Sequence, residues 1–241
     1  MMPTPFDPSP RRPMQPSPDE FIAPPCQASI RILYEDEALL LIDKPSGLLS
    51  LSGKHPQNLD SVHHRLVQDF PGCTLVHRLD FGTSGLMLVA RNKAVNAALC
   101  RQFSERSVGK EYLALLLGHL AEDEGVMDFP IAKDPPNFPL MKICDREGKP
   151  ARSRYRVLAR EQWPHGAGSL AVSRVSLRPE SGRTHQLRIH SQRLGYPMLG
   201  CDLYGGQAHA LAGRLMLHAH RLDFHHPQSG KPMAAVCDCP F

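Results

Sequence analysis

A polar loop between two short apolar runs is the feature that most restricts how this chain can fold. Leu75–Val76 leads into the loop and Leu86–Ala90 leads out of it, and both runs have the length and branching of buried strands. The loop carries His77, Arg78 and Asp80, followed by a Gly-Thr-Ser-Gly turn. Glycines adopt backbone conformations that other residues resist, and serine and threonine hydroxyls can bond the loop's own amides. Such a connection can hold a carboxylate firmly at a sheet edge, but spacing alone favours an ordinary surface turn in which Asp80 bonds its own loop.

Short apolar or alternating runs dominate the rest of the chain, with few helical patterns between them. Strands are expected at 31–34, 38–42, 110–117, 155–158 and 170–177, with a hairpin loop over 163–168. Helices are expected over 59–70, over 93–106 with Asn92 as the N-cap, and for about ten residues between a cap at Thr184 and a stop at Gly195. Residues 119–150 are expected to form loops and short strands. This element content predicts an α+β fold.

The proline distribution divides the chain into a tail and a domain. Nine prolines fall in the first 25 positions, and almost no periodic apolar pattern runs through residues 1–27. Such a composition is typical of a disordered or polyproline-like segment. Residues 28–241 are long enough to bury a core, and we expect them to form one domain.

Basic charge is concentrated in one part of the chain. The 28 lysines and arginines only slightly outnumber the 24 acidic residues, but residues 142–160 contain seven basic and two acidic side chains. A patch of this kind suits phosphate groups, and it also fits an ordinary solvated face.

Cysteine and histidine spacings favour neither disulfides nor a metal site. The seven cysteines are scattered and include no C-x-x-C pair, which argues against a disulfide framework or a zinc ribbon and fits a reducing cytoplasm. No zincin pattern accompanies the four histidines at 218, 220, 225 and 226, so we expect them to be hydrogen-bonded or exposed. No apolar run approaches the ~20 residues of a membrane span, and the N-terminus has no signal-peptide core. We therefore expect a soluble, cytoplasmic protein without a bound metal.

The loop at 77–85 resembles a known catalytic signature. Its His-Arg-Leu-Asp, followed by Thr-Ser-Gly, is similar to the signature loop of pseudouridine synthases of the ribosomal large subunit synthase A (RluA) type. In that family the aspartate is catalytic, a role that falls on Asp80, and the resemblance gives Arg78 the role of filling the gap that the target base leaves. Asp80-Phe81-Gly82 also matches the metal-binding triplet of protein kinases, but the chain has no Gly-rich loop, V-A-I-K lysine or separate H-R-D loop.

Three further segments match motifs of the same family in the expected order. The Lys-Pro-Ser-Gly turn that begins at Lys44 resembles the first motif, which implies a supporting role for this lysine. The Lys-x-Tyr sequence ending at Tyr112 matches a position whose tyrosine stacks on the target base. The run at 182–190 resembles the third motif, in which the second arginine, here Arg188, pairs with the catalytic aspartate.

Arg183 and His185 stand at the start of the helix expected in this third motif. Free backbone amides and the helix dipole favour anions at such a position, so both side chains are candidates for binding RNA. The alternative is a basic amphipathic helix that lies on the surface.

The resemblance covers roughly residues 28–241 and implies a mixed, mostly antiparallel sheet with flanking helices and an active-site cleft across its middle. It implies an RNA isomerase that breaks the N1–C1′ bond of uridine, turns the base and rejoins it through C5. Because nothing is oxidised and no group is imported, no cofactor is expected. RNA is the expected partner, and we expect a monomer. Asp80 can act as a nucleophile at C1′ or as a base at C2′, and both remain open.

The expected RNA comes from a subgroup of the family. The segment at 44–50 and the compact length are closest to the subgroup without an N-terminal RNA-binding module. Its members accept the tRNA anticodon loop at uridine 32 and a similar loop in 23S rRNA. A different rRNA or tRNA uridine and a non-catalytic RNA-binding protein of the same fold are the alternatives. A glycosidase would normally need two carboxylates, whereas the motifs supply one aspartate with an arginine partner.

Overall fold

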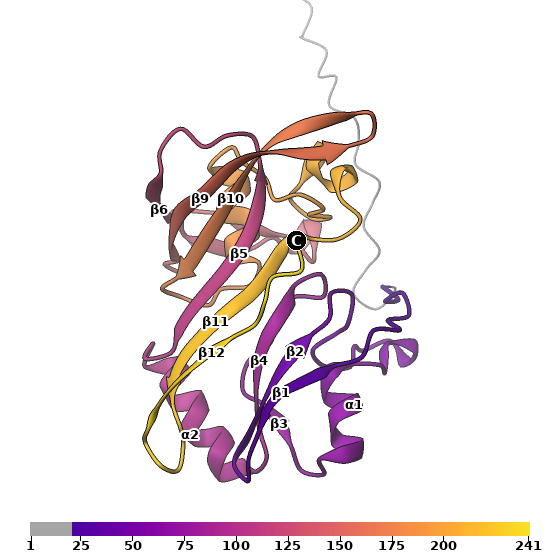
Figure 1. Cartoon of the computed structure of the whole chain (residues 1–241), viewed down its shortest axis with the longest axis vertical. Coiled ribbons are helices and arrows are strands. Elements are labelled where there is room, and N and C mark those ends of the chain that lie inside the picture. The colour runs from indigo at the N-terminus through magenta and orange to yellow at the C-terminus, as the bar shows by residue number, and fades with distance from the viewer. Residues whose placement is uncertain (1–20) are drawn as a thin grey trace, which may run out of the picture.

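The computed structural model of this chain describes residues 21–241 (Figure 1). Most of the expected proline-rich tail lies outside these described residues. Residues 21–30 form neither helix nor strand, but they contact the rest of the protein. The Asn58 side chain donates to Phe21 O at 2.6 Å and accepts from Ala23 N at 2.7 Å. The described end of the expected tail is therefore bound along the surface of the domain.

Strands make up most of the regular structure. In chain order the described strands are β1 (Arg31–Glu35), β2 (Leu39–Lys44), β3 (Thr74–Leu75), β4 (Ser84–Ala90), β5 (Gly109–Leu117), β6 (Glu124–Asp128), β7 (Ile131–Lys133), β8 (Met141–Ile143), β9 (Arg152–His165), β10 (Gly168–Pro179), β11 (Leu217–His225) and β12 (Pro232–Val236). The described helices are α1 (Val62–Asp69), α2 (Lys93–Ser104) and α3 (Gln186–Arg193), with short 3₁₀ helices η1 (Pro56–Asn58), η2 (Pro135–Asn137) and η3 (Gly206–Leu211).

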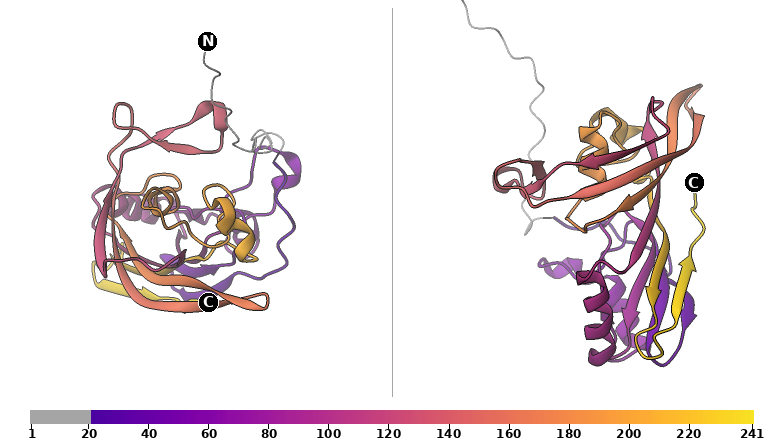
Figure 2. Two further views of the ribbon diagram at one scale, coloured as in Figure 1. Left: turned by 90° about the horizontal axis from the view of Figure 1, so that it is seen from above. Right: turned by 90° about the vertical axis from the view of Figure 1, so that its left-hand side faces the viewer.

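One sheet of ten strands organises the molecule. Its order is β1-β2-β4-β11-β5-β10-β9-β6, with β3 also pairing with β4 and β12 also pairing with β11. Within residues 21–241 every pairing in this sheet is antiparallel except that of β4 with β11, which is parallel (Figure 1). Strands β7 and β8 form a separate hairpin that projects away from the sheet (Figure 2). The predicted α+β class, with a mixed, mostly antiparallel sheet and flanking helices, is confirmed.

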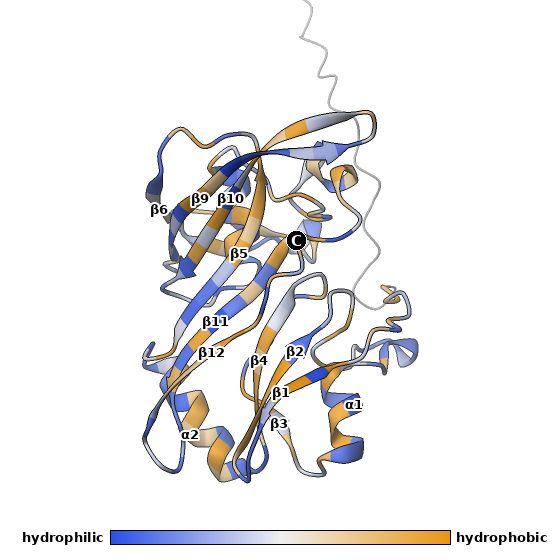
Figure 3. Cartoon of the chain, viewed as in Figure 1, coloured by the Kyte–Doolittle hydropathy of each residue, from blue (hydrophilic) through white to orange (hydrophobic). Residues whose placement is uncertain are grey.

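The apolar strands lie inside and the alternating strands lie toward an edge. Strands β2 and β4 are largely hydrophobic (Figure 3). They pair with each other, and all seven residues of β4 are buried. In β9, by contrast, Arg152, Arg154 and Arg156 are exposed and alternate with buried residues. Successive side chains of a strand point to opposite faces. Part of the predicted basic patch is therefore the exposed face of β9.

Side-chain caps determine where two of the helices begin. Asn92 caps α2 as predicted, because its Oδ1 accepts from Val95 N at 3.0 Å. Helix α1 begins at Val62, later than the predicted residue 59, because Ser61 Oγ accepts from His64 N at 3.1 Å and acts as the cap.

The predicted hairpin loop over residues 163–168 is too long. Cross-strand pairing of β9 with β10 continues through Trp163 and Pro164 to His165. Only Gly166 and Ala167 remain between the two strands, and Gly166 has a φ of 56°, which glycine adopts without strain.

Helices α1 and α2 pack on opposite faces of β2 and β4. Helix α1 shares a buried cluster with Leu40 and Met87, whereas α2 shares another with Leu39 and Leu88. Because neighbouring residues of a strand face opposite sides, the two helices cover both faces of this half of the sheet. Helix α3 packs on the other half, where Leu187 is buried among residues of β5, β10 and β11.

Candidate active site

The turn that follows β2 holds the loop of Asp80 from behind. Ser50 Oγ donates to Leu79 O at 2.8 Å and accepts from Leu79 N at 3.1 Å. Ser46 Oγ donates to Gly82 O at 2.6 Å on the other side of the aspartate. Both backbone groups of the preceding residue and one carbonyl after it are thus bonded, which restricts the position of Asp80.

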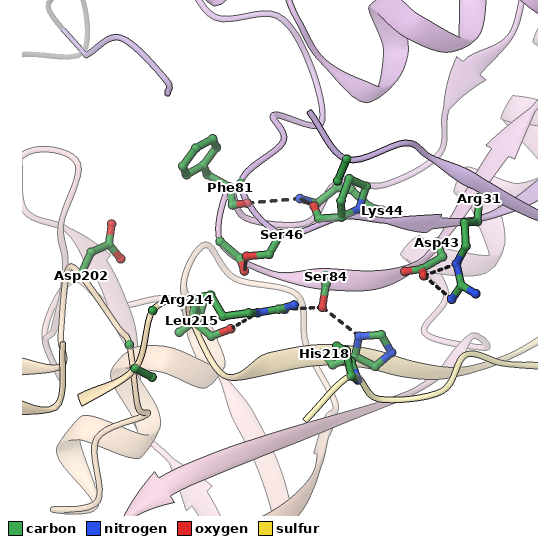
Figure 4. A pocket seen from close by; sticks show the side chains of 18 of the residues that line it. Arg31, Asp43, Lys44, Ser46, Phe81, Ser84, Asp202, Arg214, Leu215 and His218 are labelled. Carbon is green, nitrogen blue, oxygen red and sulfur yellow. Dashed lines mark hydrogen bonds and ion pairs between the residues drawn. The ribbon is translucent and has the colours of Figure 1, made fainter. Parts of the chain in front are cut away.

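Lys44 lies behind this loop. Its Nζ donates to Pro45 O at 2.9 Å and Leu48 O at 2.7 Å. It also donates to Phe81 O at 3.2 Å (Figure 4). Burial lowers the pKa of Lys44 to about 7, against a smaller opposing effect of nearby acidic groups including Asp80. Lys44 therefore links the turn to the loop through backbone carbonyls.

Asp80 and Arg188 meet between the two halves of the sheet. Arg188 Nη1 on α3 lies 3.5 Å from Asp80 Oδ2 on the loop that precedes β4. The Asp80 side chain is 28% exposed, whereas that of Arg188 is 4% exposed. The structure thus brings together the two residues that the motifs pair.

Arg188 also contacts groups other than Asp80. Its guanidinium forms a short ion pair with Asp202 and donates from Nε and Nη2 to Cys201 Sγ, both at 3.4 Å. The guanidinium also lies 5.5 Å from the centroid of the Tyr204 ring. Burial alone would lower the pKa of Arg188, but Cys201 and the two carboxylates together raise it above its ordinary value. A permanently charged group is therefore held beside Asp80.

A cavity of about 130 Å³ contains Asp80. Six of the seven residues singled out from the sequence line it, namely Arg78, Asp80, Tyr112, Arg183, His185 and Arg188. The seventh, Lys44, does not, because its ammonium points to carbonyls on the far side of the loop. The structure therefore gathers these six residues from three separate segments at one small site, namely the loop at 77–85, β5 and residues 183–188.

Tyr112 and Arg78 differ in how firmly they are held. Tyr112 on β5 is partly buried, and burial, followed by the charge of Asp80, raises the pKa of its hydroxyl. Arg78 is exposed, and no described residue forms a hydrogen bond or ion pair with its side chain. Arg78 can therefore move at the mouth of the cavity.

The start of α3 differs from the prediction. Thr184 does not cap the helix, which begins at Gln186 with His185 in the left-handed conformation at φ 54°. The buried Gln186 side chain takes over part of the capping, since its Oε1 accepts from Arg183 N at 3.0 Å and from Ser181 Oγ at 2.8 Å. The prediction of a cap at Thr184 was wrong, because the side-chain amide of Gln186, the first residue of the helix, bonds the preceding turn.

Four residues at the site were not singled out from the sequence. Ser46 and Ser50 lie inside the Lys-Pro-Ser-Gly motif segment, so their place in the motif was an available signal. Asp202 and Tyr204 lie in a Gly-Cys-Asp-Leu-Tyr segment without helical or strand periodicity. Their contacts with Arg188, and that of Tyr204 with His185, place them at the site.

A larger cavity of about 610 Å³ lies on the other side of the loop (Figure 4). Phe81, Gly82 and Ser84 line it, but Asp80 does not. Inside it, Ser84 Oγ accepts from Arg214 Nη2 at 2.5 Å and lies 2.9 Å from His218 Nδ1. These bonds join the start of β4 to β11 and its preceding loop. The smaller cavity is the candidate active site, since among the cavities lined by described residues it is the one where Asp80, Tyr112 and Arg188 meet.

The histidines near the C-terminus are hydrogen-bonded or exposed, as predicted. His225 is exposed, and the others bond Ser84 and Cys237 O (His218), Cys237 O (His220) and Asp36 (His226). Within residues 21–241 no group of three or more histidine, cysteine, aspartate or glutamate side chains could hold a metal ion. None of the described helices is long and apolar enough to cross a membrane.

Known proteins resemble this chain over most of its length. The family model for RNA pseudouridylate synthase matches residues 38–193. The dual-specificity RNA pseudouridine synthase RluA of Yersinia pestis is 46% identical over 211 residues, which is 87% of this chain and 99% of that protein. The RluA of Escherichia coli strain K12 is 43% identical over 219 residues, covering 90% and 97%. Among solved structures, human RNA pseudouridylate synthase domain containing 1 superposes with a TM-score of 0.75 at 33% identity, covering 90% of this chain and 86% of that one.

Proposed function

The chain belongs to the RNA pseudouridylate synthase family and isomerises uridine in RNA to pseudouridine, and we propose that Asp80 is the residue that acts on the target nucleotide. The observation that carries the proposal is the ion pair in the small cavity, where Asp80 Oδ2 lies 3.5 Å from Arg188 Nη1. Among the described residues that line the cavity, Asp80 is the one carboxylate. Glycosidases normally place a carboxylate on either side of the bond, so the site favours isomerisation over hydrolysis.

Asp80 begins the reaction in one of two ways. It attacks C1′ as a nucleophile while the N1–C1′ bond breaks, or it removes a proton from C2′ while the same bond breaks. In both cases the electron pair of the N1–C1′ bond leaves with the uracil. The base turns and C5 bonds to C1′, while Asp80 is released from C1′ or returns the proton to C2′. The C5 hydrogen leaves as a proton and N1 gains one. Atoms and electrons balance within the nucleotide, so the proposal needs no cofactor.

Arg188 is the partner that orients Asp80 and balances its charge. Its guanidinium carries several donors in one plane, which lets it contact Asp80, Cys201 and Asp202 together. Because Arg188 is buried, its position depends on these contacts and on the packing of α3. Lys44 acts indirectly, by holding the carbonyl of the residue after Asp80.

Tyr112 and Arg78 act on the base and on the space that it vacates. A uridine must leave its stack to reach the cavity, at a cost of a few kcal/mol that is smallest in a loop. Stacking on Tyr112 can return about 1–3 kcal/mol. The side chain of Arg78, which has no polar partner among the described residues, fills the vacated position. Arg183, which lines the same cavity, binds the RNA backbone.

Replacement of Asp80 tests this assignment. Asp80→Asn keeps the size of the side chain and removes its charge, so turnover should fall at least about a thousandfold, as expected for loss of a nucleophile or base. The assay is tritium release from RNA that contains 5-tritiated uridine, with filter binding to show that the RNA still binds. Asp69→Asn, at an exposed position on α1, is the matched control and should keep full activity. Residual activity of Asp80→Asn within tenfold of the wild type would overturn the assignment.

We further propose a short stem-loop as the RNA target, namely the tRNA anticodon loop at uridine 32, a similar 23S rRNA loop, or both. Two of the relatives described above are named as dual-specificity RNA pseudouridine synthases. The cavity is small, and the described residues form one compact sheet around it, which favours a self-contained loop over an extended RNA surface. Exposed arginines of β9 add phosphate contacts, so the affinity should fall steeply with salt.

Two measurements test the target. An isolated anticodon stem-loop should be modified at a rate within about threefold of whole tRNA, because the footprint is small. Carbodiimide primer extension of cellular RNA, with and without the gene, should show loss of pseudouridine at one or both of these loops. Loss only at other uridines would overturn the target and leave the isomerase activity in place. We also propose that the protein acts as a monomer in the cytoplasm. Sedimentation of the protein with and without the stem-loop tests its oligomeric state.

A further inference from the structure

His185 lies in the active-site cavity in an unusual backbone conformation. It stands between the Gly-Arg-Thr turn and α3 at φ 54° and ψ 17°, a left-handed conformation that costs a non-glycine residue about 1–2 kcal/mol. Its ring lines the same cavity as Asp80, Tyr112 and Arg188. Backbone strain of this kind persists where the surrounding structure determines it, and it often marks a functional residue.

Tyr204 determines which nitrogen of His185 carries the hydrogen. The Tyr204 hydroxyl oxygen accepts from Met141 N at 2.8 Å and lies 2.9 Å from His185 Nδ1. Burial raises the pKa of Tyr204 to about 12, so the hydroxyl keeps its proton. Among the described residues His185 Nδ1 is the acceptor within reach of that proton. We therefore assign the hydroxyl as the donor to Nδ1, which places the ring hydrogen of neutral His185 on Nε2.

The environment keeps this imidazole neutral. Burial lowers the pKa of His185 below its ordinary value of 6.5, and the positive charges of Arg188 and Arg78 act in the same direction. The negative charges of Asp80 and Asp202 oppose this effect and are smaller than that of burial.

The Nε2–H group has no partner among the residues that the structure describes. Within residues 21–241 Nδ1 is bonded to Tyr204, while no hydrogen bond involves Nε2. Arg188 is already engaged with Asp80, Asp202 and Cys201. His185 thus contributes a neutral N–H donor that has no partner among the described residues, in the same cavity as Arg188, whose donors are engaged.

We propose that Nε2–H of His185 is a further catalytic group, which donates a hydrogen bond to a carbonyl oxygen of the target uracil. When the N1–C1′ bond breaks, its electron pair leaves with the base, and the negative charge spreads over the ring nitrogen and the O2 and O4 oxygens. A donor aimed at one of these oxygens stabilises the detached uracil more than the bound uridine, which lowers the barrier. The proton stays on Nε2 throughout.

A neutral donor suits this position better than a charged one. A protonated imidazole beside Asp80 would form an ion pair with the carboxylate and compete with the substrate for it. A neutral N–H stabilises charge that appears on the base and leaves the Asp80–Arg188 pair undisturbed. The inference rests on the proposed role of Asp80, because the donor is useful only where the glycosidic bond is broken in this cavity.

Two substitutions of His185 distinguish loss of the N–H donor from damage to the local structure. Asparagine tolerates the left-handed conformation and can retain the bond to Tyr204, but its amide stops at the position of Nδ1. Glutamine reaches the position of Nε2 with an N–H donor. We expect His185→Asn to lower kcat about a hundredfold, as for loss of one such donor, with KM for the stem-loop within about threefold. We expect His185→Gln to recover kcat to within about tenfold of the wild type. His225→Asn, exposed at the far end of β11, is the control and should leave kcat and KM unchanged.

The outcomes are distinguishable. If folded His185→Asn has a normal kcat, the proposal is overturned, and the Asp80 test is unaffected. An effect on KM alone would also overturn the proposal, because it would indicate a contact with a phosphate group. Equal losses in the Asn and Gln variants, with unchanged melting temperatures, would also overturn it. If the His185→Gln protein does not fold, RNA with 2-thiouridine or 4-thiouridine at the target position supplies the second measurement. Sulfur is a weaker acceptor, so one of the two RNAs should slow the wild type more than His185→Asn; equal effects on both enzymes contradict the proposal.

Discussion

Arg188 is the residue on which most contacts of the site converge. It is 4% exposed and lies between Asp80 and Asp202, with Cys201 and the Tyr204 ring completing its surroundings. The planar arrangement of its donors allows these contacts at the same time. A lysine would keep the charge but present it as a single point.

Arg188→Lys should therefore lower turnover strongly without unfolding the protein. We expect kcat to fall at least about a hundredfold, because the carboxylate of Asp80 loses its oriented partner. Tritium release gives the rate and circular dichroism checks the fold. Arg193→Lys, an exposed position on the same helix, should behave as the wild type. Normal turnover of Arg188→Lys would show that the pairing does not matter.

His77 couples stability to pH. Its Nε2 accepts from Leu88 N at 3.0 Å, and its ring stacks on Phe103 with centroids 4.8 Å apart. Burial, with a smaller effect of Lys110, lowers the pKa of His77 from 6.5 to about 4. Between these two values the unfolded state binds a proton that the folded state does not, so the stability is complete above pH 6.5 and decreases as the pH falls toward 4.

Between pH 6.5 and 4 we expect the free energy of unfolding to fall by about 2–3 kcal/mol. One pKa unit corresponds to about 1.4 kcal/mol, and the value is reduced because the ring is not completely buried. Urea unfolding at several pH values between 4 and 7.5 measures it. His77→Gln retains an acceptor for Leu88 N and cannot titrate, so its profile should be flatter by this amount. Equal slopes for the two proteins would contradict the assignment.

At the scale of elements, the turn between β2 and α1 positions the loop that carries Asp80. Ser50, Ser46 and Lys44 bond the backbone of residues 79–82, so two segments that lie about thirty positions apart act as one unit. The carboxylate of Asp80 is held indirectly, through the backbone on either side of it. Strand β4, buried along its whole length, then continues from this loop.

Ser50→Ala should loosen this unit. It leaves the buried Leu79 N–H and C=O without the hydroxyl, and each unpaired buried group costs about 1–3 kcal/mol. We expect the free energy of unfolding to fall by about 2–4 kcal/mol and kcat to fall about tenfold or more, because Asp80 is less well positioned. Urea unfolding and tritium release measure the two effects. Ser104→Ala, exposed at the end of α2, should change stability by less than about 0.5 kcal/mol.

At the scale of the whole molecule, the site depends on the junction between two halves of the sheet. Asp80 precedes β4 in one half, whereas Arg188 belongs to α3, which packs on the other half. The halves meet where β4 pairs in parallel with β11, at Ser84 with His218 and at Gly85 with Ala219. This junction therefore sets the separation of the two charged groups.

Gly85→Ala should disrupt the junction. Gly85 has a φ of 109°, and a Cβ there would lie 2.3 Å from Ala219 O, a backbone atom that cannot turn away. We expect a loss of at least about 3 kcal/mol of stability, or an unfolded protein, together with loss of activity. Gly213→Ala, where an added Cβ meets no atom within 4 Å, is the control and should melt within a few degrees of the wild type. A stable and active Gly85→Ala protein would contradict this account of the junction.

Local patterns along the chain were sufficient to predict the element types, whereas the candidate site residues came from the resemblance of four segments to motifs of a known family. The apolar runs predicted the central strands, and Asn92 and Gly195 were predicted correctly as the N-cap of α2 and the stop of α3. Six of the seven candidate site residues line one cavity. The predictions of elements succeed because strand alternation, helix periodicity and caps act between residues that are a few positions apart.

Only the tertiary structure decided how those elements meet. It placed Lys44 behind the loop that carries Asp80, brought Asp202 and Tyr204 to Arg188, and made His185 the first residue before α3 in place of the predicted cap at Thr184. The bond between Ser84 and His218 joins residues 134 positions apart. Contacts of this range depend on sheet register and on the packing of helices, because no local pattern in the chain specifies which distant side chain will be the partner.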